Sequence, residues 1–94
     1  MATTIIEQHT VSYSANTFAP HIGLKSGGEF IGQLFFRPTG SQLPPDQASD
    51  GQVTLYYHLE DFANVIDLIR TENPIFLVFN GSGGGFENGI TSTP

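Results

Sequence analysis

The feature that most constrains the fold is a change of hydrophobic period between residues 52 and 79. From Gln52 to His58, apolar and polar residues alternate at every second position, which predicts a half-buried strand. Apolar residues then recur three and four positions apart, which predicts a helix over Glu60–Glu72. A continuous apolar run over 74–79 is typical of a strand that is covered on both faces. The helical stripe consists of Phe62, Ala63, Val65, Ile66, Leu68 and Ile69.

The ends of the predicted helix carry the charges that suit its dipole. Glu60 and Asp61 lie in its first turn, and Arg70 lies in its last turn. Asn73 and Pro74 follow, and proline cannot continue a helix. This helix is therefore the most strongly predicted element of the chain.

Two more strands are predicted in the first half of the chain, over Thr3–Tyr13 and Glu29–Arg37. In the first, Ile5, Val11 and Tyr13 occupy the more apolar face. In the second, both faces carry large apolar groups, which indicates a central strand or an interaction surface: Phe30, Leu34 and Phe36 on one face, and Ile31, Gln33, Phe35 and Arg37 on the other. Gly32 lies in the middle of this strand and indicates a bulge or a close approach of backbone.

Glycine and proline mark the loops between these elements. Residues 14–28 are predicted as a loop that contains a short extended piece at 21–24, and residues 38–51 as a loop of about fourteen residues. Residues 80–85 read as a Gly-rich turn, and residues 86–93 as a final, weaker strand.

The order of elements predicts one α+β domain over residues 1–94. Two architectures remain open. One is a small antiparallel sheet, and the other is an OB-like barrel; each has four to five strands and one helix between the third and fourth strands.

Composition excludes several classes of function. The chain has nine acidic and only three basic residues, a net charge of −6, so binding to nucleic acid or to anionic membranes is disfavoured. It contains no cysteine, which removes thiol catalysis and zinc–thiolate sites. The N-terminus lacks the pattern of a signal peptide and no apolar run is long enough to span a membrane, so a cytoplasmic location is expected.

One cluster of ionisable residues could carry chemistry: His58, Glu60 and Asp61 lie where a strand passes into the helix. They could form the rim of an enzymatic or small-ligand pocket, with His58 as a general base. The simpler interpretation is that the two acids stabilise the helix N-terminus. The Gly-rich segment 80–85 lacks the lysine of a phosphate-binding loop. The sequence thus predicts no catalytic, cofactor or metal residue, and enzymatic activity is disfavoured.

The leading hypothesis is a non-enzymatic protein-interaction module. If the strands over Glu29–Arg37 and Gln52–His58 pair, aromatic and polar side chains gather on one face, where they can form a binding patch for a protein partner or a second copy. A third hypothesis, binding of single-stranded nucleic acid, rests on the barrel-like order and conflicts with the charge. The predicted patch comprises Ile31, Phe35, Arg37, Tyr56 and His58.

Overall fold

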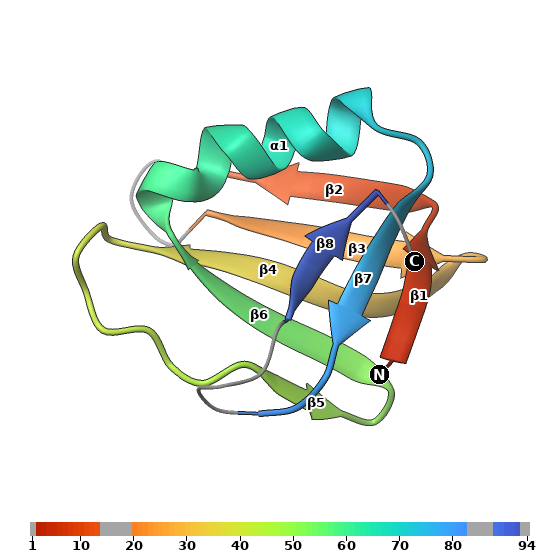
Figure 1. Ribbon diagram of the computed structural model, residues 1–94, viewed down its shortest axis with the longest axis horizontal. Helices are drawn as coiled ribbons and strands as arrows, with labels where there is room; N and C mark the ends of the chain where they lie inside the picture. Colours follow the sequence, from red (N-terminus) through yellow and green to blue (C-terminus); the bar gives the residue numbers. More distant parts are fainter. Residues whose placement is uncertain (1, 14–19, 83–87, 93–94) are drawn as a thin grey trace.

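The computed structural model describes residues 2–13, 20–82 and 88–92, and these residues form two β-sheets and one α-helix (Figure 1). The five-stranded sheet has the order β2 (Gln8–Ser12), β3 (His21–Ser26), β4 (Glu29–Arg37), β6 (Gln52–His58) and β5 (Gln47–Ser49). The three-stranded sheet has the order β1 (Ala2–Ile6), β7 (Ile75–Phe79) and β8 (Gly89–Thr91). A 3₁₀ turn, η1 (Leu59–Asp61), leads from β6 into α1 (Phe62–Thr71).

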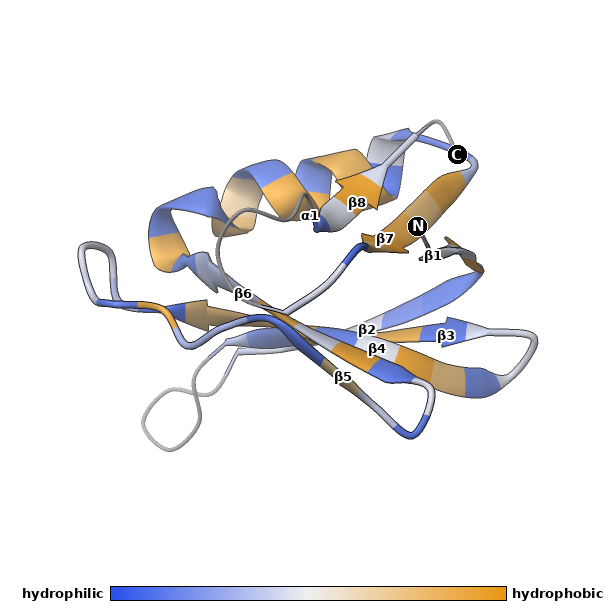
Figure 2. Ribbon diagram, turned by 60° about the horizontal axis from the view of Figure 1, so that its bottom comes forward, coloured by the Kyte–Doolittle hydropathy of each residue, from blue (hydrophilic) through white to orange (hydrophobic). Residues whose placement is uncertain are grey.

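The helix and the three-stranded sheet lie together on one face of the five-stranded sheet, as Figure 2 shows. The hydrophobic core fills the space between these layers, because each element turns its apolar side inward. Its buried residues come from four strands and the helix: Ile22, Leu24, Leu34, Phe36, Leu55, Val65, Ile69, Ile75 and Leu77.

Helix α1 packs against this core through Val65 and Ile69, which share one hydrophobic cluster with Leu77 of β7. The predicted amphipathic helix is therefore confirmed, although its first two residues, Glu60 and Asp61, belong to the tighter 3₁₀ turn η1. Ala63, which the sequence placed in the apolar stripe, is exposed. The buried stripe is narrower than the sequence pattern and centres on the i, i+4 pair of Val65 and Ile69.

The predicted fold class is confirmed as α+β, but the predicted architectures are wrong. The helix follows the sixth strand rather than lying between the third and fourth, and the sheets do not close into a barrel. The five-stranded sheet is also mixed rather than antiparallel, because β4 and β6 are parallel. Six strands precede the helix where three were predicted, for three local reasons. The residues Thr3–Tyr13 were predicted as one strand but form two, His21–Ser26 was predicted mostly as loop, and β5 lies within the predicted 38–51 loop.

The first predicted strand is divided at Glu7 between the two sheets. β1 pairs with β7, whereas β2 pairs with β3. The Glu7 backbone N–H donates to the Lys25 carbonyl at 2.9 Å, and its carboxylate accepts the N–H of Gly27. Period-two alternation does not reveal that a strand passes from one sheet to another. The three side chains that the sequence predicted on the more apolar face are exposed to solvent: Ile5, Val11 and Tyr13.

An irregularity in β4 reverses the predicted faces of two residues. Leu24 lies opposite Gly32 but Lys25 lies opposite Phe30, so Ile31 is the extra residue of a β-bulge. Ile31 is partly buried against the core, whereas Phe30 is 38% exposed. The bulge indicated by the sequence at Gly32 is therefore present one residue earlier.

Gly32 also provides the close backbone approach that its position indicated. A Cβ atom there would overlap the carbonyl oxygen of Val53 on β6 and would lie 3.3 Å from Cδ2 of Leu77. The parallel pairing of β4 with β6, and the packing of β7 of the three-stranded sheet over it, thus both depend on the absence of a side chain at position 32.

We expect Gly32→Ala to lower the free energy of unfolding by about 2–3 kcal/mol, because the new methyl group meets backbone that cannot move independently. Gly40→Ala is the matched control, since no atom lies within 4 Å of a Cβ there and only its positive φ of 88° opposes alanine. We expect the control to cost about 1 kcal/mol. Urea denaturation measures both, and equal midpoints for the two variants would contradict the steric argument.

Candidate interaction surface

The face of the five-stranded sheet turned away from α1 is here called the outer face, and it carries a row of aromatic rings. His21, Phe35 and Tyr56 lie opposite one another on β3, β4 and β6. They alternate with the buried residues Ile22 and Leu34, so they point away from the core. Ring centroids are 5.4 Å apart between His21 and Phe35, and 5.8 Å apart between Phe35 and Tyr56.

Arg37 extends this row at the end of β4. Its guanidinium carbon lies 5.5 Å from the centroid of the Tyr56 ring, within the range of a cation–π interaction. The register places Arg37 opposite His58 on β6. A fixed positive charge thus lies beside the aromatic row, with its side chain exposed to solvent.

Charge is distributed unevenly over the molecule. By strand alternation the outer face carries Lys25 and Arg37, two of the three basic residues of the chain. The segment from η1 to the residue after α1 carries four of the nine acidic residues, Glu60, Asp61, Asp67 and Glu72. The outer face is therefore electropositive relative to the rest of an acidic protein.

Contacts from the segment that connects β4 to β5 hold the β6 side of this face in place. The His58 Nε2–H donates to the Ser41 carbonyl at 2.7 Å. Oδ1 of Asp46 accepts the Tyr56 backbone N–H at 2.9 Å, and its Oδ2 accepts the Asn88 side-chain amide at 3.2 Å. Asp46 thus links β6 to residues just before β8, so the face and the three-stranded sheet are coupled through one carboxylate.

The structure brings together four of the five residues that the sequence predicted for the patch. Phe35, Arg37, Tyr56 and His58 lie on neighbouring strands in the expected register. Ile31 does not belong with them, because the β-bulge turns it toward the core. His21 belongs to the row and was missed. The alternation of His21 with the apolar residues Ile22 and Leu24 could have placed it on the outer face. The segment was predicted mostly as loop, so no face was assigned to it.

The alternative site of His58, Glu60 and Asp61 is divided by the sheet. His58 lies on the outer face, and the Glu60 backbone N–H donates to Oγ1 of Thr39 at 3.1 Å. Asp61 instead lines an open cavity of about 340 Å³ on the helix side, together with Tyr57, Asn64, Val65, Leu68 and Ile90. Among the residues that the structure describes, no three His, Asp or Glu side chains are grouped to hold a metal ion.

Tyr57 is the most strongly perturbed ionisable group in this region. Burial raises the pKa of Tyr57 to about 12, and the nearby carboxylates of Asp46 and Asp61 contribute to the rise. The ring also stacks on Phe36 of β4, with centroids 5.6 Å apart. Tyr57 therefore remains a protonated hydrogen-bond donor at neutral pH and does not act as a base.

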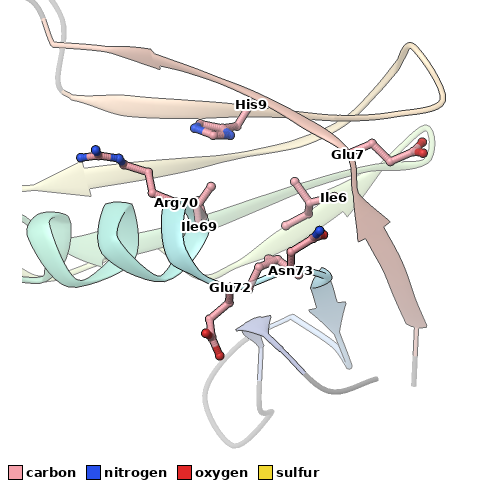
Figure 3. Close-up of a pocket in the computed structure, with 8 residues that line it drawn as sticks. Ile6, Glu7, His9, Ile69, Arg70, Glu72 and Asn73 are labelled. Carbon is pink, nitrogen blue, oxygen red and sulfur yellow. The ribbon is translucent and has the colours of Figure 1, made fainter.

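A second cavity, of about 270 Å³, lies where the C-terminal end of α1 meets the point at which β1 passes into β2 (Figure 3). Figure 3 shows that the charged ends of Glu7, Arg70 and Glu72 point in different directions. The Glu7 carboxylate is already engaged by Gly27. The polar groups around this cavity therefore do not converge on a common ligand position.

The comparisons with known proteins add no evidence on function, because no family model, curated protein or solved structure matches the chain. Over residues 2–13, 20–82 and 88–92, no helix has both the length and the apolar character that crossing a membrane requires. A function for this protein therefore has to be inferred from the geometry and charge of its own residues.

The pKa of Tyr57 predicts a loss of stability in alkali. Because the folded-state pKa of about 12 exceeds the ordinary value of 10.0, the folded protein binds the phenolic proton more tightly than the unfolded chain does. The contribution is fully present below pH 10 and is lost as the pH rises toward 12, up to about 2–3 kcal/mol. Urea midpoints between pH 8 and 11.5 should fall more steeply for the native protein than for Tyr57→Phe, and parallel curves would refute this assignment.

We expect Asp46→Ala to reduce the free energy of unfolding by about 1–2 kcal/mol, since the part-buried Tyr56 N–H loses its acceptor and the Asn88 amide keeps only its bond to the Gly81 carbonyl. Asp67→Ala, at an exposed position of α1, is the control and should change stability by less than about 0.5 kcal/mol. Thermal and urea unfolding measure both. A loss in the control as large as in Asp46→Ala would show that removal of any carboxylate, rather than this link, is responsible.

Proposed function

We propose that this protein is a non-enzymatic interaction module that binds another protein through its outer face. The observation that carries the proposal is the row of His21, Phe35 and Tyr56, extended by Arg37, across three adjacent strands. In Figure 2, no described helix or strand lies against this side of the sheet.

The residue types on this face support a protein partner. Tyrosine and arginine are enriched among the residues that dominate binding energy at protein interfaces, where a ring supplies large area with few torsions to immobilise. The rings of Phe35 and Tyr56 stack on each other at an interplanar angle of 21°, and this contact holds both rings in place. A pre-ordered surface binds at a smaller entropic cost.

The same stacking argues against single-stranded nucleic acid. Because Phe35 and Tyr56 present their faces to each other, the rings offer mainly edges to a ligand rather than platforms for bases. The net charge of −6 adds repulsion of a phosphate backbone.

The charge on the outer face indicates the chemistry of the partner. Lys25 and Arg37 favour a segment that carries carboxylates next to apolar or aromatic side chains. The alternative enzymatic pocket has less support, because His58 and Asp61 lie on opposite sides of the sheet. The cysteine-free composition is compatible with a cytoplasmic setting for this interaction.

Selection from a random twelve-residue peptide library against the purified protein tests the proposal. We expect enriched peptides to combine an acidic residue with aromatic or aliphatic ones. Arg37→Glu should weaken binding of a selected peptide at least tenfold, because it replaces an attractive charge with a repulsive one. Isothermal titration calorimetry measures the change.

Arg70→Glu is the matched control, since it makes the same charge change on α1, away from the outer face, and it should bind the peptide within about twofold of the native affinity. Equal losses in both variants would mean that only net charge matters. Failure to enrich any peptide sensitive to Arg37 or Tyr56 would overturn the proposal.

A further inference from the structure

The first strand of the five-stranded sheet, β2, forms a free edge. It pairs with β3 on one side and with no other strand of the described residues on the other. All five of its residues, Gln8–Ser12, are exposed. Alternate backbone N–H and C=O groups of such a strand point away from its neighbour and form a template for a further strand.

This edge lacks the features that usually block such pairing. β2 contains no charged residue and no proline. The opposite edge of the sheet differs, because β5 has only three residues and lies between Pro44, Pro45 and Asp46 on one side and Asp50 on the other. Short length, proline and charge are the usual means by which a sheet edge avoids pairing, so β5 is protected and β2 is not.

Exposed apolar side chains gather at the same edge. Val11 is 46% exposed and Tyr13, which follows β2, is 63% exposed. Phe30, 38% exposed, lies on the outer face close to Thr10, since a Cβ at Gly23 would lie 3.6 Å from its ring and 3.0 Å from Oγ1 of Thr10. Two of the four large apolar side chains exposed among the described residues thus lie on β2 or directly after it, and Phe30 of β4 reaches toward them across β3.

We propose that β2 pairs with β2 of a second copy of this chain, antiparallel about a two-fold axis at Thr10. In this register Thr10 faces Thr10 of the other copy, His9 faces Val11, and Gln8 faces Ser12. None of these pairs contains an acidic residue. Two molecules of net charge −6 therefore bring no carboxylates opposite each other in the ladder. The two five-stranded sheets become one continuous sheet whose outer faces lie side by side.

The register makes Thr10 the decisive position, because it is the one residue of β2 that faces itself. Thr10→Lys and Thr10→Glu should each place like charges opposite each other and weaken self-association at least tenfold. An equimolar mixture of the two variants should restore a dimer, since lysine then faces glutamate. Sedimentation velocity from 10 μM to 1 mM, chosen as a working range, measures all three samples and the native protein.

Thr4→Lys is the control, since it adds the same charge to β1, in the other sheet, and should dimerise like the native protein. Far-UV circular dichroism checks that each variant is folded, and the restored dimer in the mixture excludes misfolding as the cause of the loss. A native protein that stays monomeric at 1 mM, or a dimer that Thr10→Lys leaves intact, would overturn the proposal. A mixture that stays monomeric would overturn the two-fold register at Thr10. These outcomes do not depend on peptide binding by the outer face.

Discussion

The fold depends on covering one face of the five-stranded sheet. That face presents Ile22, Leu24, Leu34 and Leu55, all with at most 1% exposure, which a sheet alone could not shield from water. Burying side chains of this size contributes about 1.5–3 kcal/mol each, so the chain gains most by placing apolar layers against them. Helix α1 and the three-stranded sheet supply those layers jointly, since Val65 and Ile69 of the helix and Leu77 of β7 share one hydrophobic cluster with the five-stranded sheet.

The opposite face of the same sheet is left for recognition as a consequence. Because side chains alternate across a strand, the arrangement that buries Leu34 and Leu55 necessarily directs Phe35 and Tyr56 outward. The parallel pairing of β4 and β6 then brings these two rings into register, and Gly32 permits the strands to approach closely. Core packing and the candidate interaction surface are therefore two results of one strand alignment.

The sequence predicted the parts of the site that depend on regular alternation. Phe35, Arg37, Tyr56 and His58 follow strict period two, so their shared face could be derived once β4 and β6 were assumed to be neighbours. Ile31 was misplaced because a bulge shifts the alternation by one residue, and a bulge is stabilised by the neighbouring strand rather than by local propensity. The two sheets and the free edge at β2 were also missed, since one uninterrupted β-rich pattern covers both β1 and β2.

The sequence by itself determined the elements whose pattern is local: the helix at 62–71, the strands at 29–37, 52–58 and 75–79, the acidic charge and the absence of cysteine. Only the tertiary structure decided which strands pair, in which direction, and which face each sheet turns to solvent. The physical reason is that hydrophobic period reports whether a residue faces an apolar layer, whereas strand order and register are set by contacts between residues far apart in the chain.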